Sequence, residues 1–317
     1  MTYKILGITS GRKDSNSEIL LKESLLACQE QDAEVTMINL RDYNILDCTG
    51  CTACTHGMSK GKYVGCTLDK RDDKKAIMEV FFKADAIILS IPTFDLMANS
   101  TYLQFAHRNL AYCNSFLESI GAIEHKDRIA GLISVGGSSL SWQSMALESL
   151  QASCVMNNLK VVDMYLAERA AAPKQCLLYD DMIERVHKLG ENVMKSLKTS
   201  VEERKWVGDE NMGWCPNCHS NALIKGGKRW DGLYFEIECQ VCGAGGTLEK
   251  TDDGDWKFVI QENGLCRDRT STEGSAEHLV EINVTQGGFY TEENLKVVKE
   301  KFRKYKELQF PTIKIKI

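Results

Sequence analysis

Short apolar runs alternate with amphipathic stretches along the first 200 residues of the chain. The apolar runs predict buried strands at 4–9, 34–40, 84–91, 128–135 and 159–166. Between and after them, apolar residues at helical spacing predict helices at 17–31, 73–83, 96–120, 140–156 and 180–197. Strands that alternate with helices in this way indicate a parallel sheet with helices on both faces.

Five such strands fit the doubly wound, flavodoxin-like order 2-1-3-4-5. We therefore predict an α/β fold in which ligands bind at the carboxyl ends of the strands, where the connecting loops gather.

The pattern changes after residue 200. Residues 201–213 are charged and poor in aliphatic side chains, which predicts a linker. In 214–262, cysteine pairs, glycine and aromatics dominate, and short alternating runs predict a strand at 233–238 and a hairpin over 247–260. The extension 263–317 carries an apolar stripe over 291–308, which predicts a surface helix docked on the body, with a membrane or partner helix as the alternative.

Composition narrows the class of protein. With 43% apolar and 26% charged residues, the 317-residue chain is typical of soluble globular proteins. A net charge of −5 favours neither nucleic acid nor an anionic membrane as a partner. The sequence contains no run of about 18 apolar residues, so no membrane-spanning helix is predicted. The first residues predict a strand rather than an export signal. We expect a cytoplasmic protein.

The thirteen cysteines change this picture most. In a reducing compartment, clustered thiols indicate metal sites rather than disulfides. Eight of them form two clusters of four. The other five are isolated, and we expect them to be small buried apolar residues: Cys28, Cys113, Cys154, Cys176 and Cys266.

The first cluster follows the second predicted strand. Cys48, Cys51 and Cys54 form a Cys-x2-Cys-x2-Cys run, a spacing that suits one corner of an iron–sulfur cube. Cys66, which eleven residues separate from Cys54, is the candidate fourth ligand, and His56 is the alternative. A redox-active motif without a cluster is the other interpretation.

The second cluster is a Cys-x2-Cys…Cys-x2-Cys set with twenty residues between the pairs: Cys215, Cys218, Cys239 and Cys242. Two such knuckles joined by a hairpin form a tetrahedral all-thiolate site, which predicts a zinc ribbon with structural Zn²⁺. A rubredoxin-like iron is the alternative metal. Because the segment mixes basic and acidic residues, a substrate lid or protein contact is expected rather than nucleic-acid binding.

The turn after the first strand predicts an anion site. Hydroxyls and free backbone amides at a helix start could hold a terminal phosphate through Ser10, Ser15, Asn16 and Ser17, with Arg12 adding charge. A plain capped turn, with Ser15 or Asn16 as N-cap, is the alternative.

The ends of the third and fourth strands predict a binding site for a flat ring. Pro92 should end the third strand and turn the chain outward. The loop that lies along the ring would consist of Pro92, Thr93, Phe94, Asp95, Leu96 and Met97. Gly136 and Gly137, after the fourth strand, would let the backbone approach the same ring. His107 is a weak catalytic candidate and is otherwise structural.

On these residues the chain resembles the NADPH-dependent FMN reductase superfamily, and within it the iron–sulfur flavoprotein branch. The resemblance covers about the first 200 residues and rests on the 10–17 loop, Ser90–Phe94, Gly136-Gly137 and the 48–66 cysteine loop. It implies a flavodoxin-like FMN-binding domain over 1–200, homodimers or homotetramers, and a [4Fe–4S] cluster in the cysteine loop. Two departures are the long gap before Cys66 and Phe94 in place of the usual tyrosine.

The resemblance implies a flavin-dependent oxidoreductase that passes electrons between a donor, the cluster and FMN to a small acceptor. NAD(P)H or a ferredoxin is the expected donor. Quinones, oxygen species, nitro or azo aromatics and activated carbon–carbon double bonds are the expected acceptors. A cluster-free NAD(P)H:FMN or quinone reductase is one alternative, and a redox sensor or electron-transfer module without turnover is another.

Overall fold

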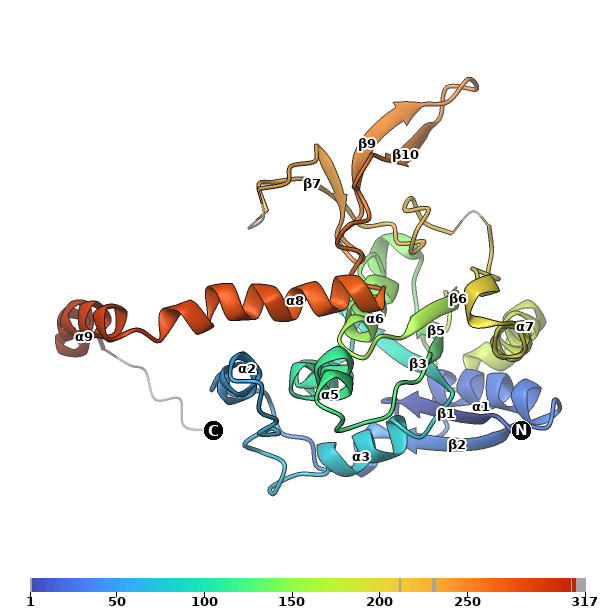
Figure 1. Ribbon diagram of the computed structural model, residues 1–317. Helices are drawn as coiled ribbons and strands as arrows, with labels where there is room; N and C mark the ends of the chain where they lie inside the picture. Colours follow the sequence, from blue (N-terminus) through green and yellow to red (C-terminus); the bar gives the residue numbers. More distant parts are fainter. Residues whose placement is uncertain (1, 211, 230–231, 309, 312–317) are drawn as a thin grey trace.

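A parallel sheet forms the centre of the molecule (Figure 1). The structure is a computed structural model and describes residues 2–210, 212–229, 232–308 and 310–311. The strand order β2-β1-β3-β5-β6 is the predicted doubly wound order. The parallel strands are β1 (Lys4–Thr9), β2 (Glu34–Asn39), β3 (Ala86–Phe94), β5 (Ile129–Val135) and β6 (Lys160–Ala167).

Helices cover both faces of this sheet, which explains why its central strands are apolar throughout. The residues of β5 are all buried. Helices α1 and α7 pack on one face, and α3, α4 and α6 pack on the other. The helices of the first 200 residues are α1 (Asn16–Gln29), α2 (Ala53–Ser59), α3 (Lys74–Phe81), α4 (Ser100–Ala106), α5 (Asn114–Ser119), α6 (Ala146–Val155) and α7 (Asp180–Lys198). Among the described residues, no helix is both long enough and apolar enough to cross a bilayer.

The long helix predicted over 96–120 is wrong. The segment is divided into the short strand β4 (Met97–Ala98), α4, a 3₁₀ turn (Asn109–Tyr112) and α5. Buried asparagines divide it because their side chains compete with the backbone for hydrogen bonds. Asn99, for example, caps α4 by accepting from the Tyr102 amide. The helix predicted from residue 140 begins only at Ala146, after a 3₁₀ turn.

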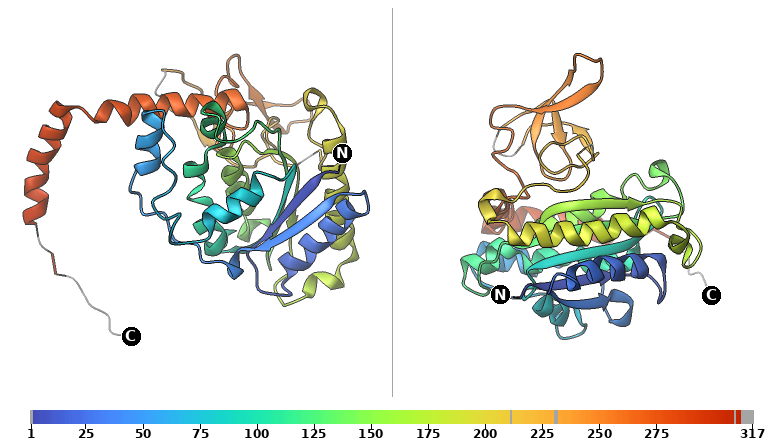
Figure 2. Two further views of the ribbon diagram at one scale, coloured as in Figure 1. Left: turned by 60° about the horizontal axis from the view of Figure 1, so that its bottom comes forward. Right: turned by 90° about the vertical axis from the view of Figure 1, so that its right-hand side faces the viewer.

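A second, antiparallel sheet of order β10-β9-β8-β7 follows (Figure 2). Its strands are β7 (Leu223–Lys225), β8 (Ile237–Cys239), β9 (Gly245–Lys250) and β10 (Trp256–Ile260). The predicted hairpin corresponds to β9–β10. The strand predicted at 233–238 lies further along the chain, as β8, and the sequence did not predict β7. Residues 211, 230–231, 309 and 312–317 of the predicted linker, ribbon and extension lie outside the described residues.

The C-terminal extension consists of two helices, α8 (Thr272–Thr285), which was missed, and α9 (Glu292–Glu307). The extent of α9 agrees with the sequence pattern, but the prediction that it docks on the body is wrong. None of its described residues is buried, and α9 stands clear of the sheet domain in Figures 1 and 2. The isolated thiol of Cys266 is likewise exposed, contrary to expectation.

Candidate functional site

The turn between β1 and α1 gathers three hydroxyls into one cradle. Thr9 Oγ1 donates to Ser17 Oγ at 3.3 Å, and Ser15 Oγ lies 3.1 Å from Ser17 Oγ. A methyl group on Gly11 would lie 2.3 Å from both serine oxygens, so the cradle requires glycine there. The amides of Asn16 and Ser17 begin α1 and have no intrahelical acceptor. Hydroxyls and free amides at a helix N-terminus are groups that can hold an anion.

The structure places the predicted phosphate-binding residues in different surroundings. Asn16 donates to the carbonyls of Ala170 (2.7 Å) and Ala172 (2.9 Å) and accepts from the Cys176 amide. Both of its amide hydrogens are therefore committed to positioning the 170–176 loop, and its side chain has no donor left for a phosphate. Arg12 is exposed and lines a hollow toward the end of β2. Ser15 does cap α1, as the alternative interpretation proposed.

Asn99 is a site residue that the sequence analysis missed. Its side chain is 2% exposed, accepts from Ser10 Oγ at 2.6 Å and donates to the Ser10 carbonyl at 3.0 Å. Ser10 therefore lies at the base of the cradle and connects it to the loop after β3. An asparagine directly before a helix that follows a strand is the local signal that could have indicated this role.

The loop after β3 is a tight hairpin rather than an open loop. Strand β3 continues through Pro92 to Phe94, and Phe94 pairs with Met97 of β4. Pro92 is tolerated because β1 stops pairing with β3 at Ser90, which leaves one side of β3 without a neighbour there.

The hairpin turns at Asp95 and Leu96, which have φ values of 48° and 75°. A leucine in this left-handed region is strained, and such strain concentrates at functional sites. The Leu96 carbonyl accepts from the Met145 amide at 3.0 Å, and Thr93 Oγ1 lies 2.8 Å from Ser134 Oγ. The hairpin is thus fixed to β5 and to the start of α6, with the Phe94 ring 59% exposed at its tip.

The two glycines after β5 have packing reasons of their own. A methyl group on Gly136 would lie 2.1 Å from Gln143 Oε1, and one on Gly137 would lie 2.6 Å from Ala171 Cβ. Gln143 is 2% exposed and donates to the Ser138 carbonyl at 2.6 Å. The glycines therefore allow the loops after β5 and β6 to close on each other at the same edge as the hairpin.

The cysteine loop surrounds a separate cavity of about 180 Å³. Cys48, Cys51, Cys54 and Cys66 all line it. Cys54 and Cys66 pack against the main core, whereas Cys48 and Cys51 are exposed. Four thiols that line a cavity, rather than crowding around one point, are what a cluster requires, because each cysteine binds a different iron.

The thiols of the loop also differ in their surroundings. A hydrogen bond between Cys51 Sγ and Thr67 Oγ1 (3.5 Å) is the main contact that lowers the pKa of the Cys51 thiol, whereas burial raises the pKa of Cys54.

A buried ionic network sets the positions of the two ends of this loop. Arg108, with a side chain 1% exposed, pairs with Asp72 and lies 3.4 Å from Asp69. Asp72 accepts from the Leu46 amide, two residues before Cys48, and Asp69 accepts from the Cys66 amide, both at 2.9 Å. Tyr112 donates to Asp69 at 2.5 Å. One guanidinium therefore holds both the entry and the exit of the cysteine loop.

The C-terminal extension closes the cavity. Gln286, at the end of α8, lines it together with His107 and Arg108. His56, the alternative fourth ligand, instead packs edge-on against Tyr290 with ring centroids 4.6 Å apart. His107 is exposed and lies at the wall of the cysteine cavity rather than at the hairpin.

Helix α4 joins the two parts of the site. Its cap, Asn99, contacts the anion cradle, and its last turn leads into His107 and Arg108 at the cysteine cavity. Seven helical residues span roughly 10 Å. A group bound at the carboxyl edge and a cluster in the cysteine cavity would thus be close neighbours.

The second cysteine cluster forms a tetrad in the antiparallel domain. The Sγ atoms of Cys215, Cys218, Cys239 and Cys242 all lie within 4.8 Å of one another. Hydrogen bonds from the other three thiols, that of Cys215 first, lower the pKa of Cys239. Such crowding suits a single tetrahedral metal ion.

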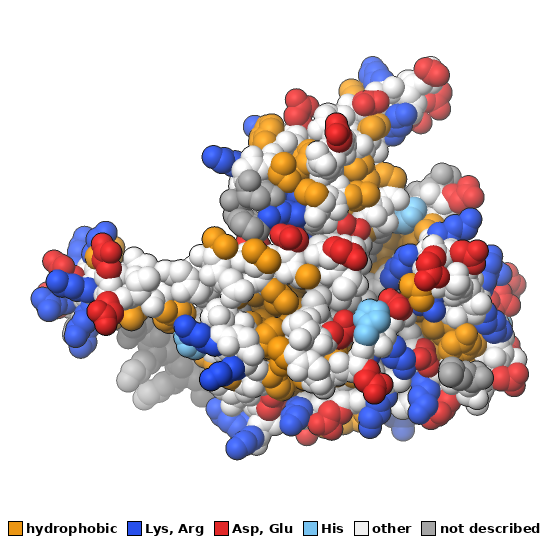
Figure 3. Space-filling view, viewed as in Figure 1, with side chains coloured by type: hydrophobic (Ala, Val, Ile, Leu, Met, Phe, Trp, Pro, Cys, Tyr) orange, Lys and Arg blue, Asp and Glu red, His pale blue; other side chains and the backbone are white. Residues whose placement is uncertain are grey.

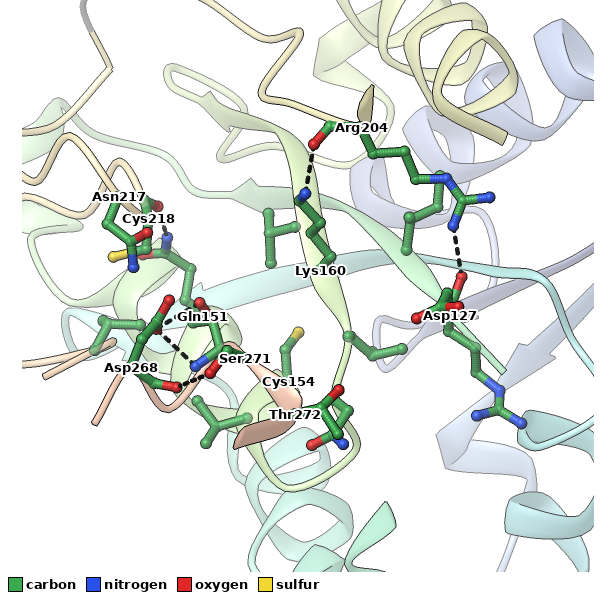
Figure 4. Close-up of a pocket in the computed structure, with 18 of the residues that line it drawn as sticks. Asp127, Gln151, Cys154, Lys160, Arg204, Asn217, Cys218, Asp268, Ser271 and Thr272 are labelled. Atoms are coloured by element: carbon green, nitrogen blue, oxygen red, sulfur yellow. Dashed lines mark hydrogen bonds between the residues drawn. The ribbon is translucent and has the colours of Figure 1, made fainter. Parts of the chain in front are cut away.

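The antiparallel domain is docked away from the cradle, beside a cavity of about 400 Å³ (Figure 4). Gln151 of α6 donates to the Cys218 carbonyl at 2.6 Å, and Trp206 stacks on His219 with ring centroids 4.1 Å apart. The cavity lies at the amino ends of β5 and β6, where Lys160 donates to the Arg204 carbonyl. It is thus at the opposite edge of the sheet from the anion cradle.

Comparisons with known proteins identify relatives of this chain. A flavone synthase of Aspergillus candidus is 24% identical over 300 residues, which are 88% of each chain. An iron–sulfur flavoprotein of Methanocaldococcus jannaschii is 25% identical over 203 residues, 62% of this chain and 97% of its own. Among solved structures, a flavone reductase superposes with a TM-score of 0.73 at 23% identity and covers 98% of this chain and 100% of its own.

The family comparison matches residues 3–171 to "NADPH-dependent FMN reductase". This segment contains the cradle, the hairpin, the cysteine loop and the glycines after β5. The relatives support FMN as the cofactor and a flavin-dependent oxidoreductase as the class of enzyme. The chain belongs to the NADPH-dependent FMN reductase family.

Proposed function

We propose that the protein is an FMN- and [4Fe–4S]-containing oxidoreductase that reduces an activated carbon–carbon double bond in a planar aromatic compound of the flavone type. The observation that carries the two-cofactor proposal is that one short helix, α4, leads from the anion cradle to the four-cysteine cavity. FMN supplies hydride chemistry when it is bound, and a cluster supplies one-electron transfer.

The cradle hydroxyls of Ser15 and Ser17, with Ser10 at its base, would hold the FMN phosphate. The hairpin 92–97 and the loop at Gly136 and Gly137 would flank the ring. FMN fits here because the cradle offers helix-start amides and hydroxyls, the donors that phosphate prefers. In this assignment Asn16 acts by positioning the neighbouring loop.

The four-cysteine cavity fits a cluster on observations beyond the thiols. Arg108 Nε is a buried donor that lacks a hydrogen-bond partner among the described residues, and Arg108 lines the cavity. Donors of this kind stabilise the sulfurs of reduced clusters. Cys66 is the fourth ligand in this proposal, since it lines the cavity and His56 contacts Tyr290 instead.

The proposed class of acceptor rests on two observations. The flavone synthase and the flavone reductase match the chain over most of its length, including the parts beyond residue 200. In addition, large apolar side chains are exposed next to the hairpin, at Phe94 (59%), Leu140 (51%), Trp142 (69%) and Met145 (42%). An exposed apolar patch beside a cofactor edge suits a flat aromatic ligand.

Reduction of one such double bond takes two electrons and two protons. One NAD(P)H and one solvent proton supply them, or two one-electron transfers from a ferredoxin with two solvent protons.

The tetrad of the antiparallel domain would hold structural Zn²⁺, because four thiolates leave no open position for a substrate. Assembly as a homodimer or homotetramer is part of the proposal.

Metal and flavin analysis of the anaerobically purified protein tests these assignments together. We expect about four iron, about one zinc and about one FMN per chain, with broad cluster absorbance. NADPH and reduced ferredoxin would then be compared as donors for flavone and for a benzoquinone. Faster turnover of benzoquinone than of flavone would make it a quinone reductase, and an iron-free yellow protein would disprove the cluster.

Substitution Gly11→Ala tests the cradle by itself. The new methyl group would lie 2.3 Å from Ser15 Oγ and Ser17 Oγ and would displace both hydroxyls. Because each hydrogen bond to a charged group contributes about 1.5–3 kcal/mol, FMN affinity should fall about 10- to 100-fold. Fluorescence titration of the flavin-depleted protein measures it. Gly227→Ala, whose methyl group meets nothing within 4 Å, is the control, and equal FMN affinity in both variants would refute the assignment.

A further inference from the structure

Helix α9 presents an apolar face that nothing in the described part of the chain covers. Leu295, Val298, Phe302 and Tyr305 are 46%, 47%, 58% and 62% exposed. None of the described residues of α9 is buried, and the helix stands apart from the sheet domain in Figure 2. An isolated helix of 16 residues is marginal in water, because helices in proteins depend on packing of their apolar face. The face therefore requires a partner.

The spacing of these four residues shows what kind of partner fits. They follow one another at intervals of three, four and three residues, the a/d pattern of a coiled-coil seam. Such a seam packs best against another helix with the same spacing. A helix docked on a protein surface has the same spacing, so the charges of α9 are needed to specify a second copy as the partner.

The charges of α9 specify the direction of pairing. Its first turn carries Glu292 and Glu293, and its last turn carries Lys304 and Lys306. Helices α8 and α9 together form an arm that extends from the body. In Figure 3, the far end of this arm is covered mainly by lysine and arginine side chains. In an antiparallel pair of two copies, the acidic first turn of each helix lies against the basic last turn of the other. The positive end of each helix dipole also lies beside the negative end of the other, which is favourable.

We propose that α9 pairs in antiparallel direction with α9 of a second copy of this chain. In this register Leu295 lies opposite Tyr305 of the second copy, and Val298 lies opposite its Phe302. Glu292 then flanks Lys306 of the second copy, and two-fold symmetry repeats each contact. Lys299 and Lys301 each meet their own counterpart at the centre, so the stability of the pair comes from the apolar seam and the two end pairs.

Helix α9 is connected to the body through α8, which packs against it. Helix α8 is fixed to the body through a cluster formed by Met58, Phe116, Leu117 and Ile282. Ser115 Oγ also donates to Ser275 Oγ at 2.9 Å. Because α8 begins beside the antiparallel domain and ends at the cysteine cavity, pairing through α9 would join two copies next to their cluster sites.

Light scattering after gel filtration of the full-length protein tests the pairing. Substitution Phe302→Asp places a charge in the seam, and we expect the particle mass to fall by half. Val297→Asp is the matched control, because Val297 is 42% exposed on the same helix but lies outside the a/d seam. We expect it to keep the mass of the unaltered protein. A monomeric unaltered protein, or an unchanged mass for Phe302→Asp, would overturn the proposal and assign the face to another protein.

Charge exchange tests the direction of pairing. Glu292→Lys and Lys306→Glu should each raise the dissociation constant of the arm contact about threefold to tenfold, and the double variant should restore it. Failure of the double variant to recover would overturn the antiparallel register. Iron, zinc and flavin contents should be equal in all these variants, so that the result is independent of the proposed enzyme function.

Discussion

Replacement of Arg108 by methionine is expected to lower the free energy of unfolding by about 3–5 kcal/mol and to empty the cysteine cavity of iron. The Asp72 side chain that pairs with Arg108 is 0% exposed, so loss of the guanidinium would leave a buried carboxylate without compensation. Asp69 and Asp72 would then no longer hold the Cys66 and Leu46 amides in place. Thermal unfolding and iron analysis of the purified variant measure the two effects.

Two further variants separate the ionic network from burial alone. Arg128 is also 2% exposed, but its guanidinium donates to the Phe82 carbonyl and the Asn114 amide oxygen and forms no ion pair in the described residues. Arg128→Met should therefore be destabilised while it retains iron. Adding Asp72→Asn to Arg108→Met should recover part of the stability. Full iron loading in Arg108→Met would show that the network does not position the cysteine loop.

The sheet and the cysteines could be predicted from the sequence because their signals are local. Apolar runs on a sheet covered on both faces determine the strands, and the spacing within each cysteine group shows that the thiols converge. The contacts of Arg108 with Asp72 and Asp69 have no such local signal, since they span 36 and 39 residues. The sequence therefore indicated which thiols lie together but not which residues hold them in position.

The errors of prediction have the same origin. The apolar stripe of α9 predicts a face that needs cover, but amphipathicity does not specify what provides it. Asn16 has the residue type and position of a phosphate ligand, yet its amide is used by the loop at Ala170 and Ala172, more than 150 residues away. Pro92 was expected to end β3, but the strand continues because its neighbour β1 has already ended.

Substitution Cys66→Ser is expected to remove most of the iron and the broad cluster absorbance while FMN remains bound. Four thiolates complete a cubane, and Cys66 is the cysteine of this cavity that the sequence separates from the compact run. FMN should remain because the cradle and the hairpin are built from other loops. Iron analysis and the visible spectrum of anaerobically purified protein measure the change.

The controls decide whether the loss reflects ligation. Cys266→Ser alters an exposed isolated thiol and should leave iron unchanged. His56→Ala should also keep its iron, because the imidazole packs against Tyr290 rather than lining the cavity. If Cys66→Ser kept about four iron per chain and His56→Ala lost them, histidine would be the fourth ligand, and its imidazole would have to leave Tyr290 when the cluster is loaded. The cavity, the Asp69 contact to the Cys66 amide and the packing of Cys66 on the core all favour the cysteine.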